Sequence, residues 1–468
     1  MLRFISILLA SILFVTFSNG QPIHISGKVK ISIITGTIEA ALKMTNIPRI
    51  KDYTILLNTG LNVEYIADSS CTIRYNTERE FDSFLRSEAL QYYIPSDKKG
   101  EKYIPSSLTL KYVGKYPVIS DTSRRFESGD WKGNIAFNGK SLRVTEQSYW
   151  YPQFYDKINE KVFDKVTYEL EIESDGCGYI FINGNNPVKA KFARLSSTEA
   201  IIPFMFIGNY NVKEIGETIF INSQASSKTL SIVNSWLIKI EKYYEENLQI
   251  PYKKSIYFVE TSPTSESNEF QFVSYPTICA VGNQSFLSKI IDQANYQLKD
   301  STIISFLMHE LGHYYFGNVL KTNSSLQYVL GEGITEFISL KCTNVLLSNN
   351  IYKTKINKYL KTIPQKENYI SLKKINSDKD ALQSYDYSYN FIPLLFLCVE
   401  REIGSEKLWK WFKEMLQTKN TLTNYDFLCR TALRSGISTE EFTVLEEKYF
   451  SDESSYENVI KSFVEKLK

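Results

Sequence analysis

A short stretch with two histidines and a glutamate constrains this chain more than any other feature. Residues 301–313 read S-T-I-I-S-F-L-M-H-E-L-G-H, which places His309, Glu310 and His313 in the pattern H-E-x-x-H. If the stretch is a helix, the two imidazoles lie on one face, about one turn apart. Ring nitrogens at that spacing can reach one Zn²⁺, and Glu310 beside them can take a proton from a metal-bound water.

The residues around the motif favour a metal site over a chance match on a surface helix. Ionisable side chains on a buried helix need partners, because burial without them carries a large free-energy cost. The chain has three histidines, and two of them are in this motif. The stretch is apolar on nearly all sides, as is typical of a buried helix, through Ile303, Ile304, Phe306, Leu307, Met308 and Leu311. We therefore predict that His309 and His313 bind a metal ion.

A third ligand candidate follows His313 after residues 314–331. Glu332 opens the sequence E-G-I-T-E-F, which is typical of a helix start with two carboxylates four residues apart, Glu332 and Glu336. A catalytic zinc site needs three protein ligands and one open position, and two histidines with one glutamate are a recurring set. Glu332 is the predicted third ligand. Glu336 has two interpretations: a hydrogen-bond partner of a ligand imidazole, or a carboxylate on a solvated helix face.

These residues resemble the zinc-binding core of the gluzincin aminopeptidases, the aminopeptidase N family. The stretch H-E-L-G-H-Y-Y-F-G-N, the spacing to Glu332 and the sequence E-G-I-T-E-F are similar to that family's H-E-L-x-H-x-W-F-G-N and N-E-G-F-A-E-F signatures. The resemblance implies an aminopeptidase with one zinc ion and a peptide substrate. It also implies an α+β fold, with an N-terminal β-rich saddle or sandwich domain before a mostly helical thermolysin-like catalytic domain and C-terminal helices.

The expected chemistry is hydrolysis of a peptide bond by a metal-activated water, with Glu310 taking the water proton and returning it to the leaving amine. The family also uses a tyrosine hydroxyl to stabilise the oxyanion. Counting back from Ile403-Gly404 puts Tyr389 at that position, with Tyr387 as the competitor. Ordinary aromatic packing is the third interpretation of this tyrosine.

One family motif is missing. In the family, G-x-M-E-N lies on the edge strand of the substrate cleft, and its glutamate binds the free amine of the substrate. Residues 275–286 of this chain read Y-P-T-I-C-A-V-G-N-Q-S-F and contain no acidic side chain. A short-peptide endopeptidase therefore stays open beside the aminopeptidase, and so does an inactive zinc-containing binding or scaffold protein.

The N-terminal residues indicate a compartment. The pattern is typical of a cleaved signal peptide: Arg3, then an apolar run over residues 4–17, then small residues at 18–20 where cleavage would occur. The apolar run is too short for an ordinary transmembrane helix. We expect a secreted or periplasmic protein whose mature chain has no transmembrane segment. The six cysteines are compatible with disulfide bonds there, and buried free thiols are the equal alternative. The net charge is +2 and the sequence has no long basic run, so it does not indicate a basic surface that binds nucleic acid.

The length of 468 residues suggests several domains. We expect a signal peptide at 1–20, a β-rich domain at 21–223, a zinc catalytic domain at 224–345 and a helical part at 346–468 that completes it. Residues 53–58 and 149–154 also resemble the family's saddle domain.

Short β-branched and aromatic runs predict the strands, and hydrophobic periodicity predicts the helices. An amphipathic helix is expected to begin at Ser226, which would cap it. Strands are expected at 28–37, 53–57, 71–75, 107–113, 165–172, 177–182, 255–260 and 270–282. Further helices are expected at 78–93, 391–401, 406–417, 439–449 and 456–466.

Overall fold

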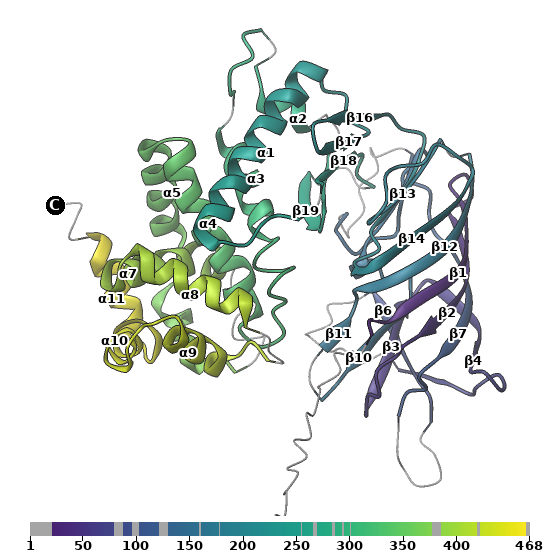
Figure 1. Ribbon diagram of the computed structural model, residues 1–468, viewed down its shortest axis with the longest axis horizontal. Coiled ribbons are helices and arrows are strands. Elements are labelled where there is room, and N and C mark those ends of the chain that lie inside the picture. The colour runs from purple at the N-terminus through teal and green to yellow at the C-terminus, as the bar shows by residue number, and fades with distance from the viewer. Residues whose placement is uncertain are drawn as a thin grey trace, which may run out of the picture.

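The computed structural model describes residues 21–78, 88–95, 103–120, 130–158, 161–176, 178–253, 255–264, 269–282, 286–292, 294–299, 301–376, 385–418 and 422–464. A β-rich part, purple to blue in Figure 1, lies beside a helical part that runs from teal to yellow. This order confirms the expected α+β architecture. The expected signal peptide lies outside the described residues.

Three sheets build the β-rich part. Six strands pair in the order β14-β12-β1-β2-β7-β4, five in the order β11-β10-β3-β6-β5, and four in the order β13-β15-β9-β8. Their bounds are β1 His24–Ser32, β2 Thr37–Thr45, β3 Tyr53–Asn58, β4 Leu61–Ala67, β5 Asn76–Glu78, β6 Ala89–Tyr93, β7 Leu108–Lys115, β8 Ala136–Phe137, β9 Ser141–Val144, β10 Gln153–Asp156, β11 Lys161–Phe163, β12 Val166–Asp175, β13 Tyr179–Ile182, β14 Phe192–Ile201 and β15 Met205–Gly208.

The core of this part follows from alternation along the strands. In β2, the side chains of Ile38, Ala40, Leu42 and Met44 are buried, whereas those between them are exposed or half-buried. Successive side chains of a strand point to opposite faces, so one face packs on the core and the other meets water. The central strand β3 is buried at every position, which indicates that both of its faces are covered.

The expected strands are partly confirmed. Residues 53–57, 107–113, 165–172 and 177–182 correspond to β3, β7, β12 and β13. The strand expected at 28–37 is instead the end of β1, a turn and the start of β2. The strand expected at 71–75 is wrong, since that stretch contributes only an isolated bridge between Thr72 and Ala67.

The helix expected at 78–93 is wrong where the chain is described. Residues 89–93 form β6, which pairs with β3 and β5, and residues 79–87 lie outside the described part. Gln91 and Tyr92 of β6 are buried in this pairing. Strand pairing and burial of this kind override a local preference for helix.

A second five-stranded sheet, in the order β16-β17-β18-β20-β19, leads into the helical part. Its strands are β16 Val212–Ile215, β17 Thr218–Ile221, β18 Tyr257–Thr261, β19 Phe270–Ser274 and β20 Thr277–Val281. The strand expected at 270–282 is therefore two antiparallel strands joined at Tyr275-Pro276. Because β17 pairs with β18, this sheet already begins before residue 224, where we expected the catalytic segment to start.

The helices build the rest. Ser226 caps α1 as expected, because its hydroxyl accepts a hydrogen bond from the Thr229 N–H at 3.1 Å. The α-helices are α1 Ser227–Leu248, α2 Phe286–Ile290, α3 Ser301–Gly312, α4 Ile334–Leu346, α5 Asn349–Thr362, α7 Ile392–Ile403, α8 Ser405–Gln417, α9 Tyr425–Arg434, α10 Thr439–Leu445 and α11 Ser454–Val464. Short 3₁₀ turns are η1 Glu146–Ser148, η3 Lys366–Asn368 and η4 Leu372–Lys374, and π-helical turns are η2 Val329–Gly333, η5 Tyr387–Phe391 and η6 Glu446–Phe450.

The four C-terminal helices expected from periodicity correspond to α7, α8, α10 with η6, and α11. Helices α5 and α9 were not among the predictions. Among the helices that the structure describes, none has the length and hydropathy needed to cross a bilayer.

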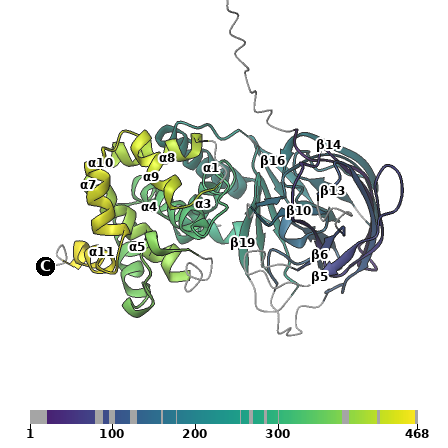
Figure 2. The same cartoon turned by 90° about the horizontal axis from the view of Figure 1, so that it is seen from below.

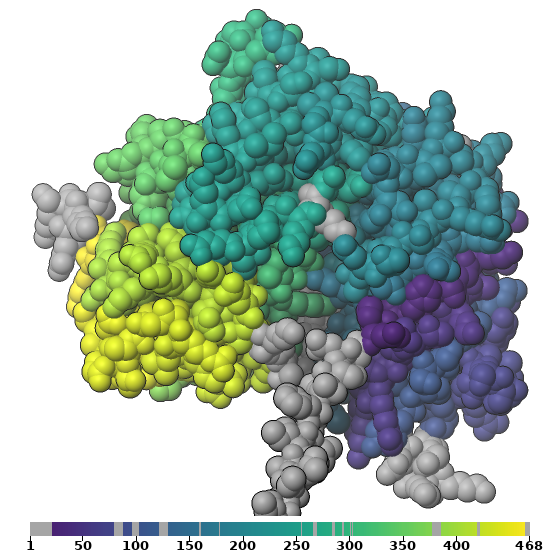
Figure 3. All heavy atoms as spheres, viewed as in Figure 1, coloured from purple at the N-terminus to yellow at the C-terminus, as the bar shows by residue number. Residues whose placement is uncertain are grey.

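The two parts meet at the edge strand β19, which lies between them in both cartoon views (Figures 1 and 2). The buried Asn183 side chain, in the turn after β13, donates to the carbonyls of Ser274 at 2.8 Å and Tyr275 at 3.2 Å. Lys165 donates to the Asn318 carbonyl at 2.8 Å. Figure 3 shows the blue and teal surfaces in contact, with the yellow C-terminal helices at the far side of the teal region.

Candidate metal centre

Helix α3 carries the H-E-x-x-H motif, and it is buried as its apolar sequence predicts. Ile304, Leu307 and Met308 are fully buried in the core of the helical part. The α3 helix ends at Gly312, and the His313 N–H still bonds to the His309 carbonyl at 3.3 Å, which continues the turn. The two imidazoles therefore stay on one face, with ring centroids 4.6 Å apart.

The side chains of His309, His313 and Glu332 converge on one point. Their ligand atoms all lie within 4.8 Å of one another. Glu332 Oε2 lies 3.3 Å from His309 Nε2 and 3.2 Å from His313 Nε2. Donor atoms bound tetrahedrally at the usual zinc distances would lie about 3.3 Å apart. The geometry and the chemistry of this donor set therefore fit Zn²⁺.

The opposite ring nitrogens of both histidines have acceptors. His309 Nδ1 lies 2.7 Å from Glu336 Oε2, and His313 Nδ1 lies 3.2 Å from the Phe316 carbonyl. A proton on each Nδ1 leaves each Nε2 lone pair facing the common point, which is how outer partners fix the tautomer of a ligand imidazole. Glu336 is therefore a buried partner of His309 and does not lie on a solvated helix face.

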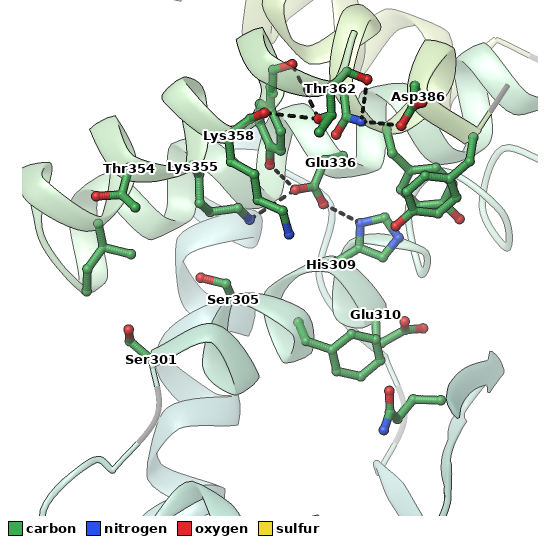
Figure 4. A pocket seen from close by; sticks show the side chains of 17 residues that line it. Ser301, Ser305, His309, Glu310, Glu336, Thr354, Lys355, Lys358, Thr362 and Asp386 are labelled. Carbon is green, nitrogen blue, oxygen red and sulfur yellow. Dashed lines mark hydrogen bonds and ion pairs between the residues drawn. The ribbon is translucent and has the colours of Figure 1, made fainter. Parts of the chain in front are cut away.

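Glu336 is the centre of a buried network. Its second oxygen, Oε1, accepts a hydrogen bond from the Tyr359 hydroxyl and pairs with Lys355 Nζ at 3.0 Å. Burial raises the pKa of Glu336, but Lys355, His309 and Tyr359 together lower it to about 2. The carboxylate is therefore ionised at neutral pH and holds His309 in place (Figure 4).

Glu310 follows the first histidine and is also buried, at 6% exposure. It lines the cavity that contains all three converging side chains, and also a second cavity that reaches His309. Burial raises the pKa of Glu310, while the neighbouring His309 and His313 oppose that shift. A carboxylate with a raised pKa is suited to accept a proton and give it back.

Tyr389 stands beside the site, and Tyr387 does not. The Tyr389 ring stacks on His309, with centroids 5.6 Å apart. Burial and the Glu332 carboxylate raise the pKa of Tyr389, so it keeps its proton and can donate it. The Tyr387 ring is buried in the core, and its hydroxyl donates to the Ile370 carbonyl at 2.9 Å.

Two π-helical turns position Glu332 and Tyr389 at the site. Glu332 lies in η2 and Tyr389 in η5, and these turns pack against each other. π-helical turns are frequent at functional sites. Gly333 allows the close approach, because a Cβ there would lie 2.4 Å from Ile392 Cγ2.

Two cavities open from the site. The smaller, of about 340 Å³, lies between β19, η1 and the metal-ligand candidates; the larger, of about 660 Å³, lies between α3, α5 and η5 (Figure 4). Pockets of this size hold small ligands in many proteins.

The edge strand of the cleft precedes residues 275–286, the stretch in which the family's acidic motif is expected. β19, residues 270–274, is the edge strand, and its residues Gln271, Phe272 and Val273 line the smaller cavity; β20 lies inside the sheet. β19 contains no acidic residue either. Two carboxylates reach this cavity from the β-rich part instead: Glu146 of η1, and Asp164, which pairs with Lys321.

Glu146 is already paired. Lys132 Nζ lies 2.5 Å from Glu146 Oε1 and donates to the Val273 carbonyl at 2.7 Å, and the Ser274 hydroxyl donates to Glu146 Oε2 at 2.9 Å. Sequence reasoning missed Lys132 and Glu146, as it missed Lys355 and Tyr359. No spacing pattern connects any of them to His309.

Solved structures share this fold. Native yeast LTA4 hydrolase matches with a TM-score of 0.61 at 14% sequence identity, over 92% of this chain and 67% of that one. Yeast LTA4 hydrolase in complex with bestatin matches with a TM-score of 0.59 at 13% identity and the same coverage. No protein-family model and no curated protein matches the sequence. The fold is thus the one that the resemblance to gluzincin aminopeptidases implies.

Proposed function

We propose that this protein is a zinc metallopeptidase that hydrolyses peptide bonds. The observation that carries the proposal is the convergence of His309, His313 and Glu332 on one point in the wall of the smaller cavity. Zinc held by these three residues would supply a water of lowered pKa and would polarise the scissile carbonyl.

The chain's own residues supply the remaining steps. Glu310 takes the proton of the attacking water and passes it to the leaving amine. Tyr389, whose ring stacks on His309, donates a hydrogen bond from its hydroxyl to the oxyanion of the tetrahedral intermediate. Glu336 keeps His309 oriented throughout.

An aminopeptidase is the first candidate within this class. A free amine needs an anionic partner, and the Glu146 carboxylate lines the smaller cavity at the metal-ligand candidates. A substrate ammonium would compete for it with Lys132, which pairs with the carboxylate at 2.5 Å.

A short-peptide endopeptidase is the second candidate. The pairing of Glu146 with Lys132 favours it, because it leaves no unpaired carboxylate on the described wall formed by η1 and β19. Free and N-acetylated forms of the same peptides separate the two. We expect acetylation to abolish cleavage by an aminopeptidase; equal cleavage of both forms would reject that candidate.

The decisive variant is Glu310→Gln. We expect it to bind one equivalent of zinc with normal affinity and to lose peptide hydrolysis, because an amide cannot accept the water proton. Zinc content and turnover of a peptide panel measure the two effects. Hydrolysis at the wild-type rate in this variant contradicts the mechanism, and stoichiometric zinc in a wild-type protein that cleaves nothing favours an inactive scaffold instead.

We also propose that the protein is exported, on the basis of residues 1–20. N-terminal sequencing of the protein from its host is the test. We expect the mature chain to begin close to residue 21, and a chain that retains Met1 contradicts cleavage.

A further inference from the structure

We propose that the larger cavity beside the metal-ligand candidates is a subsite for a carboxylate of the substrate, held by Lys355 and Lys358 of α5. The inference rests on the proposed function, since it takes the occupant of the cavity to be part of the peptide that is cleaved. To the proposed function it adds that the peptide carries a negative charge near the bond that is cleaved.

The two lysines enter the cavity from one face of α5. They are three residues apart, which places them on neighbouring turns of the same side of the helix. Both line the cavity, and both side chains run from α5 toward Glu336 and His309 in Figure 4. By contrast, Lys353 and Lys361 of the same helix do not line it.

The ammonium groups have donors to spare. A lysine ammonium has three N–H donors. Lys355 Nζ pairs with Glu336 Oε1 at 3.0 Å, and in the described part of the chain this is its one ion pair. Lys358 Nζ has no ion-pair or hydrogen-bond partner among the described residues. One carboxylate placed between the two lysines would therefore meet unused donors on both.

Of the three carboxyl groups that line the cavity, Glu336 and Asp386 have hydrogen-bond partners. Glu336 bonds to His309, Lys355 and Tyr359, so neither of its oxygens is open to a substrate cation. Asp386, on the other wall, accepts a hydrogen bond from Asn390 Nδ2 at 2.9 Å. Glu310 also lines the cavity, and Lys355 and Lys358 are the two ammonium groups on its α5 wall.

The position of the lysines limits which carboxylate can reach them. The contacts from Lys355 to Glu336, 3.0 Å, and from Glu336 to His309, 2.7 Å, connect the ammonium to a metal-ligand candidate. An extended peptide advances about 3.3–3.6 Å per residue, so the carboxylate belongs to a residue within about three positions of the scissile bond. It is either an acidic side chain or the C-terminal carboxylate of a short peptide.

The test uses binding to full-length Glu310→Gln protein, so that it does not depend on turnover. Four fluorescent pentapeptides differ only in Glu or Gln at one position and in a free or amidated C-terminus, and this set is repeated for the first three positions after the scissile bond. We expect a peptide with a carboxylate at the right place to bind about tenfold more tightly than its neutral counterpart, as for a hydrogen bond to a charged group. The Glu and the C-terminal arms distinguish the two sources of that carboxylate.

Lys358→Gln should reduce this preference to less than threefold, and Lys358→Glu should reverse it in favour of a matching Lys peptide. Lys353→Gln, a neutral variant of the same helix outside the cavity, should keep the preference intact. Equal binding of all peptides, or an unchanged preference in Lys358→Gln, overturns the subsite.

The outcome separates this inference from the proposed function. If wild-type protein cleaves all peptides alike and Lys358→Gln changes nothing, the peptidase stands and the subsite is wrong. If the inactive variant shows the lysine-dependent preference while wild-type protein cleaves none of the peptides, the subsite stands and the peptidase is wrong.

Discussion

Tyr387 and Tyr389 lie two residues apart and occupy different environments. We expect Tyr389→Phe to lower kcat by roughly 10²–10³, as for the loss of one oxyanion donor, with KM and zinc content little changed. Steady-state kinetics on a peptide substrate measures this. Tyr387→Phe is the matched control, since its hydroxyl bonds to the Ile370 carbonyl; it should cost about 1 kcal/mol of stability and leave kcat unchanged. A larger kcat loss in Tyr387→Phe contradicts the assignment.

Glu241 of α1 makes stability depend on pH. Burial, together with Glu217 and Glu245, raises its pKa from 4.5 to about 7. Below pH 4.5 the Glu241 carboxyl is protonated in both the folded and the unfolded protein. Between pH 4.5 and about 7 it ionises only in the unfolded chain, which favours unfolding. The contribution of Glu241 to stability therefore falls as the pH rises through this range.

We therefore expect Glu241→Gln to stabilise the protein above pH 7 by on the order of 1 kcal/mol, a figure that allows for partial solvent screening, and to have little effect at pH 4. Urea unfolding at the two pH values measures the difference. Glu246→Gln, at an exposed position of the same helix, should change little at either pH. An equal effect of Glu241→Gln at both values would rule out this linkage.

At the residue scale, spacing on a helix fixes which side chains share a face, and the structure brings the three predicted ligands together. His309, His313 and Glu332 follow from spacing and resemblance, and so does the choice of Tyr389 over Tyr387. Glu146 and Lys355 could not be found in this way. Each reaches the site through contacts between segments far apart in the chain, and no local pattern encodes such contacts.

At the scale of elements, the packing of η2 on η5 positions Glu332. A Cβ at residue 333 would lie 2.4 Å from Ile392 Cγ2 and 2.8 Å from Ile392 Cβ. We expect Gly333→Ala to destabilise the protein by roughly 1–3 kcal/mol through overpacking and to weaken zinc binding, because it displaces the neighbouring Glu332. Urea unfolding and a chelator competition measure the two effects.

Gly331→Ala is the control from the same turn, since its Cβ would meet Thr322 Oγ1 at an ordinary 3.7 Å. It should leave zinc affinity unchanged. Equal effects of the two substitutions would mean that the contact with Ile392 does not hold the turn.

Elements with strong periodicity were predictable, and those set by pairing were not. Helices α1 and α8 have one apolar face, which their sequences reveal. β6 is a strand because β3 and β5 pair with it on both sides. Helix α5 buries only Tyr359 fully, so its sequence has little periodicity to detect, although it supplies Lys355 and Tyr359 to the Glu336 network.

At the scale of the whole molecule, Asn183 joins the β-rich part to the cleft strand. Besides the Ser274 and Tyr275 carbonyls, it bonds to the Ile202 carbonyl at 3.0 Å and accepts from Thr277. We expect Asn183→Ala to lower the free energy of unfolding by roughly 2–4 kcal/mol, because several buried groups lose their partner. It should also raise KM, because β19 lines the cleft.

Asn185→Ala is the control, since the partners of this side chain among the described residues, Tyr168 and Ser196, lie within the β-rich part. It should leave KM unchanged. If Asn183→Ala destabilises the protein without changing KM, the contact supports the fold but not the cleft.

The overall architecture was predictable because the resemblance carried it, whereas the border between the parts was not. β16 and β17 are as short as many of the strands before them. They belong to the sheet beside the helices because β17 pairs with β18 and β16 pairs with β17. The composition of a strand does not reveal which sheet it joins.

Zinc K-edge X-ray absorption on the purified wild-type protein tests the central claim most directly. We expect one zinc per chain, with two imidazole nitrogens at about 2.0–2.1 Å, one carboxylate oxygen and one further light atom from solvent. In the His313→Ala variant, one imidazole contribution should be lost. A site with sulfur ligands, a closed set of four protein ligands, or a spectrum unchanged in His313→Ala would contradict a catalytic metal centre at His309, His313 and Glu332.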